Sequence, residues 1–436
     1  MNGRRTVLVT GADQHQGLAV IRGIGRAGLG VIAAGAEARS LGFYSRYAGQ
    51  RAQYRSPLAD PVGFQEDILR IVREARPAVV IPSVETTLVL LNQVRSELER
   101  YTVLAAPPPH VLEAALDKWR TLAIAGRVGV PVPRTVRGDT TDEILARAGS
   151  LRPPFVVKPR GNALHLSTAN AIGFKARYAS DTQELRALIA RHTGDAPALL
   201  VQEYASGIGR CVAAVCDRGT PLALFAYQRE REYPRSGGVS VVRRSIPLDE
   251  RLREFVTALL RETRWHGVAM VEFKYDPKTA HYTLMEINGR FQASTALSLD
   301  AGLNLPHLVA SLYAGWDLPA MGPYRVGVTE RWLRGDLLAL RDALGARRKT
   351  DGIAVRQFFL DFRPGMHFDE FTHDDWRPGL AELWSLGVLV AGWVAEWLVD
   401  RVRWRQRVPL PAVSALVSAP AHRSIRAYTA SKVSGD

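Results

Sequence analysis

Cysteine is nearly absent from this 436-residue chain, which contains only Cys211 and Cys216. These two residues are five positions apart in an expected strand, so their side chains should face opposite ways. A disulfide between them and a cysteine metal site are therefore not expected. The N-terminal residues also lack the long apolar stretch of a signal peptide, so a cytoplasmic protein is expected.

Acidic residues are too few to balance the basic ones, and the formal net charge is +14. Only seven of the basic residues are lysines, so almost the whole excess is arginine. The arginines are spread along the chain, with a modest cluster at Arg401, Arg403, Arg405 and Arg407. Neither a nucleic-acid reader motif nor a basic-aromatic array accompanies them, so no nucleic-acid partner is expected.

The first 110 residues alternate short apolar strands with helices. Strands are expected at 6–10, 31–34 and 78–81, and amphipathic helices at 17–28 and 64–74. This alternation predicts a parallel α/β sheet. The three prolines at 107–109 mark the end of the region, and one helix is expected over 111–127.

Residues 155–290 change to a β-rich pattern with two interleaved helices, at 182–191 and 250–263. Hairpin turns are expected at 217–219 and 276–278. The predicted fold class is therefore α/β followed by α+β. The expected strands are 155–158, 198–203, 211–216, 222–228, 239–246, 269–275 and 281–287.

The tail contains a long apolar stretch, residues 383–399, with Trp384, Trp393 and Trp397. A helix packed on the core or in a homodimer interface is the favoured interpretation. The alternative is peripheral contact of residues 383–407 with an anionic membrane, such as the inner membrane face, because the arginine cluster follows the tryptophans directly.

Four polar residues near an expected hairpin carry the strongest chemical signal. Glu272, Glu286, Asn288 and Arg290 all have even numbers, and a hairpin centred near residue 279 places the two glutamates opposite each other. Two carboxylates and an amide oxygen suit Mg²⁺, and the arginine can stabilise a transferred phosphoryl group. The alternative is an ordinary hairpin with a solvated charged face.

Two of the scarce lysines precede this hairpin. Lys118 lies on the expected 111–127 helix, and Lys158 ends a buried strand beside a small, polar segment, 161–173. A compact ammonium is a good phosphate ligand, and such a segment can cover phosphates with backbone amides. The strand that ends at Gln202 and Glu203 becomes polar abruptly, and its main chain could contact an adenine.

These segments, in this order, resemble the ATP-grasp superfamily, specifically the carboxylate–amine ligase branch related to carbamoyl phosphate synthase. The resemblance covers about residues 1–325 and is most specific in Glu-Ile-Asn-Gly-Arg-Phe at 286–291. It implies a Rossmann-like pre-ATP-grasp domain (1–110) and an ATP-grasp domain (111–325) with a small lobe (130–205) and a core lobe (206–325). A C-terminal helical extension (326–436) follows.

The resemblance also implies roles for single residues. Lys118 and Lys158 would contact the phosphates of ATP, and Arg290 would act with Lys158 in catalysis at the γ-phosphate. Residues 207–210, which follow the adenine hinge, include no acidic residue. The ribose contact is therefore made by Glu203 or is absent. The remaining implied sites are the hinge (Gln202, Glu203, Tyr204, Ala205), the Mg²⁺ ligands, for which Mn²⁺ could substitute (Glu272, Glu286, Asn288), and the substrate contacts (Glu85, Arg235, Arg243).

The expected function is an ATP-dependent ligase that activates a carboxylate as an acyl phosphate for attack by an amine or another nucleophile. A phosphotransferase and a silent nucleotide-binding membrane scaffold are the alternatives. Dinucleotide binding is not expected, because the turn at 11–17 lacks the G-x-G-x-x-G spacing. His15 and His266 are isolated in the sequence, and we expect both to be structural.

Overall fold

The computed structural model describes residues 5–161, 176–191, 198–234, 238–346 and 351–406. The chain divides into two compact units, residues 1–381 and 382–436, which are treated separately below. Arg235, Arg407 and all but the first residue of the predicted 161–173 phosphate-covering segment lie outside the described residues.

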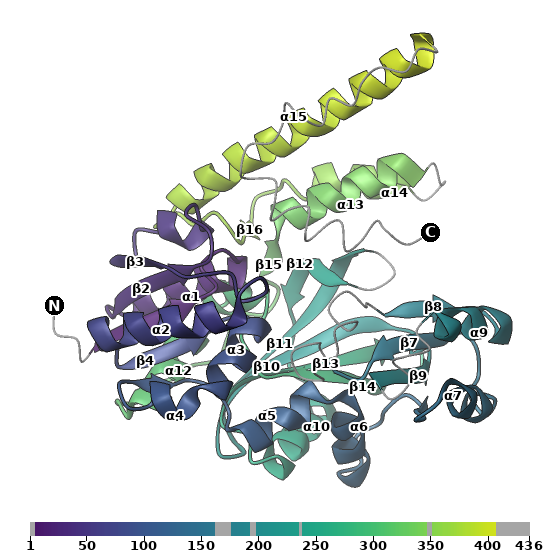
Figure 1. The fold of residues 1–436 in the computed structure, drawn as a ribbon, viewed down its shortest axis with the longest axis horizontal. Coiled ribbons are helices and arrows are strands. Elements are labelled where there is room, and N and C mark those ends of the chain that lie inside the picture. Colours follow the sequence, from purple (N-terminus) through teal and green to yellow (C-terminus); the bar gives the residue numbers. More distant parts are fainter. Residues whose placement is uncertain (1–4, 162–175, 192–197, 235–237, 347–350, 407–436) are drawn as a thin grey trace. The chain divides into compact units, whose positions relative to one another are not determined.

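The N-terminal sheet is parallel, with the strand order β3-β2-β1-β4-β5 (Figure 1). Both of its faces are covered, because Val7 and Val9 pack in the same apolar cluster as helices α1 and α12, whereas Leu8 packs in the cluster of α2 and α3. The strands are β1 (Thr6–Thr10), β2 (Gly30–Gly35), β3 (Gln50–Gln53), β4 (Val79–Pro82) and β5 (Val103–Leu104).

The helices of this domain connect those strands. Five elements were not predicted, namely β3, β5, η2, α3 and α4. Of these, β3 is an exposed polar edge strand without an apolar period. The bounds are α1 (His15–Arg26), η2 (Leu41–Tyr44), α2 (Pro61–Ala75), α3 (Glu85–Gln93) and α4 (Arg95–Leu98).

The largest sheet has seven strands in the order β14-β13-β10-β11-β12-β15-β16. Its strand pairs are antiparallel except for β15 with β16. The last two strands come from residues that the sequence assigned to a C-terminal extension. The bounds are β10 (Ile208–Asp217), β11 (Thr220–Tyr233), β12 (Val239–Ser245), β13 (Gly267–Asp276), β14 (His281–Asn288), β15 (Thr329–Arg331) and β16 (Met366–Phe368).

Alternate residues of β10 face two different apolar clusters. Val212, Ala214 and Cys216 pack in the cluster of α10 (Glu250–Glu262), whereas Cys211 packs in the cluster of α11 (Thr295–Asp300) and α12 (Leu305–Ala314). The two cysteines are buried, free and on opposite faces, as predicted.

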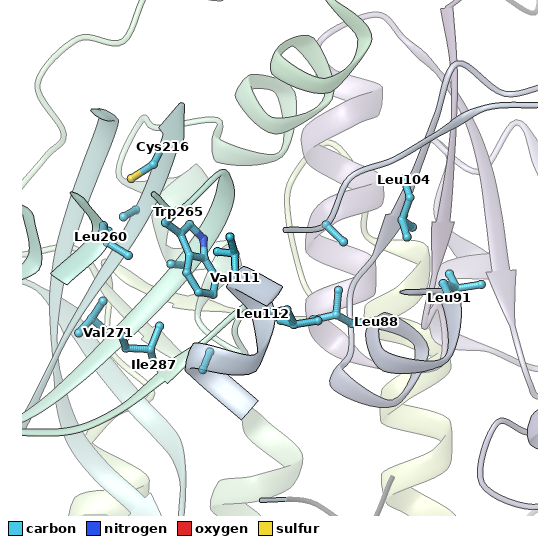
Figure 2. Close-up of a cluster of buried hydrophobic side chains, with 14 of the residues drawn as sticks. Leu88, Leu91, Leu104, Val111, Leu112, Cys216, Leu260, Trp265, Val271 and Ile287 are labelled. Carbon is cyan, nitrogen blue, oxygen red and sulfur yellow. The ribbon is translucent and has the colours of Figure 1, made fainter. Parts of the chain in front are cut away.

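Helix α5 (Pro109–Leu116) joins the N-terminal sheet to the seven-stranded sheet. Figure 2 shows Leu112 beside Leu88 of α3, while its neighbour Val111 lies against Trp265. All four side chains belong to one buried cluster. Burial of these large side chains stabilises the contact by roughly 1.5–3 kcal/mol each.

A smaller sheet, with the order β6-β9-β7-β8, has its own core. Phe155 and Val157 of β7 point into this core, against α7 (Thr141–Ala148) and α9 (Thr182–Ala190). Alternation along the strand therefore turns Lys158 to the opposite face. The bounds are β6 (Thr135–Val136), β7 (Phe155–Pro159), β8 (Arg177–Ala179) and β9 (Leu199–Glu203).

The single helix predicted over 111–127 is wrong, because the structure has two helices that meet at Asp117. Asp117 has an extended backbone and ends α5, and its side chain accepts hydrogen bonds from the amides of Trp119 and Arg120 to cap α6 (Lys118–Arg127). A capping aspartate satisfies amide donors at a helix start that would otherwise have no partner. Lys118 is therefore the first residue of a new helix.

The chain continues after β15 with α13 (Leu333–Ala346), α14 (Asp351–Leu360) and α15 (Arg377–Gln406). The stretch Arg377–Glu396 of α15 is, among the described residues, a helix long and apolar enough to cross a membrane. The predicted mixed α/β fold is confirmed.

Candidate functional site

The β13–β14 hairpin brings two glutamates face to face. Near the turn the strands pair one residue out of the predicted register, with Tyr275 opposite Tyr282. An irregularity beside Glu272 leaves Met285 without a partner and restores the register, so that Glu272 lies opposite Glu286 as predicted. The Asn288 amide then donates a 2.9 Å hydrogen bond to Oε1 of Glu286.

An arginine that sequence reasoning missed reaches this pair across the sheet. Arg229 of β11 donates to Oε2 of Glu272 and lies 3.4 Å from Oε1 of Glu232. The intervening strand has Gly209 at this level, where a Cβ atom would lie 2.9 Å from Cδ of Arg229. Because Gly209 has no side chain, the Arg229 side chain can extend past it to Glu272.

Lys118 approaches the pair from the helix break. Its Nζ lies 4.0 Å from Oε2 of Glu286, and its amide donates a 2.8 Å hydrogen bond to the carbonyl of Arg160. The Arg160 guanidinium in turn binds both oxygens of Asp117, the cap of α6, at 2.6–3.0 Å. Lys118 is thus held between the smaller sheet and the hairpin.

Lys158 lies on the face of the smaller sheet that points away from the core of that sheet. There the charges of Lys118, Glu286 and Glu272 act on it. Burial lowers the pKa of its ammonium to about 8, and the charge of Lys118 adds to that effect, while Glu286 and Glu272 oppose it. An anionic ligand would therefore strongly stabilise the charged form of this ammonium.

The two glutamates differ in their pKa directions. Burial raises the pKa of Glu272, and Glu286 adds to this, although Arg229 opposes it. Burial also acts upward on the pKa of Glu286, but Lys118, the Asn288 amide and Lys158 outweigh it and hold that pKa below its ordinary value. The cationic side chains therefore favour a charged Glu286 at neutral pH.

Arg290 follows the hairpin and faces the N-terminal domain. Its Nε lies 4.0 Å from Oε2 of Glu85, the first residue of α3, and its Nη2 lies 3.5 Å from Oδ1 of Asn288. Two predicted site residues from distant parts of the chain, Glu85 and Arg290, are therefore brought together.

A second group of polar side chains, also missed from the sequence, lies near Arg290. His15 stacks on Trp332 with 4.8 Å between ring centroids, and its buried Nε2 has no hydrogen-bond partner among the described residues. Both amide atoms of buried Gln292 likewise have none there. Burial lowers the pKa of His15 to about 4, and among the charges acting on it are those of Asp369, Arg243 and Arg290. Its ring is therefore neutral at pH 7.

Arg243, a predicted substrate contact, is fully buried. Its guanidinium binds Glu330 at 2.9–3.0 Å, pairs with Asp369 and donates to the carbonyls of Ser240 and Ala293. All three of its nitrogens thus have protein partners. Arg243 therefore belongs to a buried ion cluster. Neither interpretation from the sequence, an open substrate contact or a solvated strand face, describes this environment.

The predicted hinge lies at the end of β9. Gln202 is buried and donates through its side chain to Thr135, while Oε1 of Glu203 accepts from Nη1 of Arg134 and from the amide of Arg152. Tyr204 is half exposed. The Glu203 carboxylate is therefore engaged within its own lobe.

The donor set at the hairpin fits a hard divalent cation. Glu272, Glu286 and the amide oxygen of Asn288 are oxygen ligands, and two facing carboxylates in a partly buried site need positive charge between them. Within the described residues no three His, Cys, Asp or Glu side chains gather as a metal site, so any cation here has a mixed carboxylate–amide set.

Some signals for the missed residues were present in the sequence. A glycine at 209 inside a strand indicates a close approach, which the Arg229 side chain makes. His15 follows a strand–helix turn, but its proximity to Arg290 depends on packing between segments 275 residues apart and carries no local signature.

Comparison with known proteins supports the resemblance to the ATP-grasp superfamily. Residues 195–335 match a family model described as ATP-grasp in the biosynthetic pathway with Ter operon. Over 245 residues the chain is 25% identical to the arginine-specific large chain of carbamoyl phosphate synthase from Eremothecium gossypii, a match that covers 51% of this chain and 20% of that protein.

Two further proteins extend the comparison. Over 218 residues the chain is 27% identical to D-alanine–D-alanine ligase from Acidiphilium cryptum, covering 49% of this chain and 66% of the ligase. The chain thus spans less than two thirds of either relative. Biotin carboxylase from Campylobacter jejuni has a similar fold, with a TM-score of 0.61, 17% identity and 74% coverage of each chain. The chain therefore contains an ATP-grasp domain.

Proposed function

We propose that this protein is an ATP-dependent ligase that activates a carboxylate as an acyl phosphate for attack by an amine. The observation that carries the proposal is the meeting of Lys118 and Lys158 with the facing pair Glu272 and Glu286. ATP binding and dependence on Mg²⁺ are typical of the ATP-grasp ligase family.

The residues divide the binding of ATP between them. Lys118 and Lys158 bind the α- and β-phosphates, as compact ammonium groups do well. The adenine lies against the chain at Gln202–Ala205. Glu272, Glu286 and Asn288 would hold one or two Mg²⁺ ions, with Mn²⁺ as a substitute, and the metal supplies charge neutralisation on the transferred phosphoryl group.

The reaction has two steps. A substrate carboxylate oxygen attacks the γ-phosphorus in line, and the bond from that phosphorus to the β-phosphate oxygen breaks to release ADP. An amine then attacks the acyl carbon, phosphate leaves and the nitrogen loses a proton. Lys158 and Arg290 stabilise the negative charge during transfer, and Glu85 positions the Arg290 guanidinium at 4.0 Å.

The proposed substrate position is beside Arg290, close to polar groups that have no hydrogen-bond partner among the described residues. Neutral His15 and Gln292 offer hydrogen bonds without charge, so they suit the polar part of a small substrate. Groups of this kind are costly to bury unless a ligand or water binds them. Arg235 stays a proposed substrate contact, and it lies outside the described residues.

A screen of amino acids, other carboxylic acids and amines for ADP release tests the proposal. Glu286→Gln and Lys158→Gln should lower kcat/KM by about a hundredfold or more, because each removes charge that stabilises the transferred phosphoryl group. Exposed Glu74→Gln and Lys278→Gln are matched controls that should keep wild-type turnover. If either site variant keeps full turnover, the assigned site is wrong.

The products separate ligation from simple phosphotransfer. A ligase releases ADP and phosphate in step with a joined product, and only when both the carboxylate and the amine are present. A stable phosphorylated product formed without an amine would instead indicate a phosphotransferase. Mass spectrometry of the reaction mixture distinguishes the two.

A further inference from the structure

The C-terminal helix α15 exposes apolar side chains along one broad side. Residues 383–395 include no charged side chain. The polar residues Ser385 and Glu396 lie outside the exposed apolar side of the helix. Trp384 is 75% exposed, and only 22% of the stretch Arg377–Glu396 is buried. The large exposed side chains are Leu383, Trp384, Val388, Val390 and Val394.

Helical spacing places these side chains together. Positions 383, 384, 387, 388, 391, 394 and 395 repeat at intervals of three and four, so they form a continuous stripe. Residues 382, 385 and 396, which are polar, fall on the other side of the helix wheel. A contiguous apolar stripe of this length on a protein surface marks a contact with another apolar phase.

Charge next to this stripe indicates which phase covers it. Arg401, Arg403 and Arg405 follow within the same helix, after Glu396 and Asp400, and outnumber these two acids. A second copy of the chain would bring the same arginines into proximity or leave them unmatched, whereas anionic lipid headgroups match them. Basic clusters beside a membrane-active helix are attracted by roughly 1 kcal/mol for each residue, or about fivefold in affinity.

We propose that α15 attaches the protein to an anionic lipid bilayer, with the 383–395 stripe in the acyl-chain region and the three arginines at the headgroups. The helix is long and apolar enough for this by length and composition. Trp384, which is exposed within the stripe, suits the boundary between headgroups and acyl chains. The attachment is independent of the ligase chemistry.

Flotation of the full chain with vesicles tests the proposal. Phosphatidylcholine vesicles containing phosphatidylglycerol should carry the protein to the top of a density gradient, and phosphatidylcholine alone should do so more weakly. Val388→Asp places a charge in the stripe and should lower partitioning at least about tenfold. Replacing the three arginines by glutamine should lower it about a hundredfold on the anionic vesicles.

Two controls match these variants. Leu58→Asp changes an exposed leucine outside α15, and Arg39→Gln, Arg51→Gln and Arg191→Gln together remove the same charge from exposed positions elsewhere. Both controls should float like the wild type. Circular dichroism and ADP release in detergent check that every variant is folded.

Two results would overturn the proposal. One is a wild-type chain that stays at the bottom of the gradient with anionic vesicles. The other is a homodimer, measured by analytical ultracentrifugation without lipid, that Val388→Asp converts to monomers while flotation is unchanged. In that case a second copy covers the stripe.

Discussion

Three cationic side chains surround the facing glutamates of the hairpin. Arg229 binds Glu272, Lys118 lies 4.0 Å from Glu286, and Lys158 is close enough for both carboxylates to act on its pKa. Glu232, beside Arg229, and Lys274, 4.0 Å from Glu232, bring the balance to four cationic side chains against three carboxylates. Such an excess suits a polyphosphate together with a metal ion, because each partner then meets opposite charge.

Lys158 should link ATP binding to proton uptake. Its pKa of about 8 means that the ammonium is partly deprotonated just above pH 8, and anionic phosphates favour the charged form. ATP binding near pH 8 should therefore take up a fraction of a proton, and affinity should fall as the pH rises further. Calorimetry in two buffers of different ionisation enthalpy measures this. Lys158→Arg stays charged, so equal uptake in that variant would contradict the assignment.

His15 should make folding stability depend on acid. The unfolded chain protonates this imidazole near pH 6.5, whereas the folded pKa is about 4. The unfolded state therefore binds more protons between these values, and stability falls as the pH drops through that window, by about 1–3 kcal/mol for this partly exposed ring. Urea unfolding at several pH values measures the slope. An unchanged slope in His15→Gln would refute this origin.

At the scale of single elements, Asp117 combines two tasks. It caps α6, and it binds Arg160, whose carbonyl accepts the amide of Lys118. A continuous helix would have no such residue and would place Lys118 in its middle. The sequence predicted the lysine but not the break, because residues 111–127 have an unbroken helical pattern and contain no glycine or proline before Gly126.

Asp117→Ala should therefore affect both stability and ATP binding. Loss of the cap costs about 1 kcal/mol, and release of Arg160 and Lys118 should weaken ATP binding about tenfold. The matched control is Asp181→Ala, which removes the same kind of cap from α9 by breaking bonds to the amides of Gln183 and Glu184. Denaturation should show a loss for Asp117→Ala that is at least as large as the loss for Asp181→Ala, because Asp117 also binds Arg160. A Kd for ATP that changes equally in both would argue against the special role of Asp117.

The hairpin shows why part of the site could be predicted from the sequence. The turn residues and the even spacing of Glu272, Glu286 and Asn288 are local, so their pairing followed from strand geometry. Met285 could not be predicted as a bulge, and the correct register at Glu286 arises because the bulge compensates for a turn one residue tighter than expected. Arg229 reaches the site through tertiary packing, which spacing does not encode.

On the scale of the whole molecule, the late part of the chain completes structures begun early. Strands β15 and β16 extend the seven-stranded sheet from residues 329–331 and 366–368. Their short sequences have no strand signal of their own, because β15 forms by pairing with β12 and β16 forms by pairing with β15. The predicted mixed α/β class depended on long periodic segments, whereas these strands depend on partners distant in sequence.

A buried ion pair connects the N-terminal domain to a loop after β16. Arg22 of α1 is 1% exposed and donates from Nε to Asp375 at 2.9 Å. The same carboxylate accepts hydrogen bonds from the Ser45 hydroxyl and the amide of Arg46. Further guanidinium nitrogens bind the carbonyls of residues 369, 370 and 375.

Asp375→Ala should destabilise the fold by about 3–5 kcal/mol, because it leaves the Arg22 charge buried without its partner. Glu66→Ala is the control, since it removes an exposed partner of Arg55 and should cost less than about 1 kcal/mol. Guanidinium chloride unfolding of both variants measures the difference. Comparable losses in the two variants would show that the Arg22–Asp375 pair contributes no more to the free energy of unfolding than the exposed Arg55–Glu66 pair.

The Arg22–Asp375 pair also sets a condition on the order of synthesis. Its two members are separated by 353 positions, so a ribosome that adds 5–20 residues per second needs roughly 20–70 s between them. During that interval α1 has been translated but its guanidinium has no carboxylate partner from the loop. In the nascent N-terminal domain the Arg22 guanidinium therefore stays solvated until Asp375 has been translated.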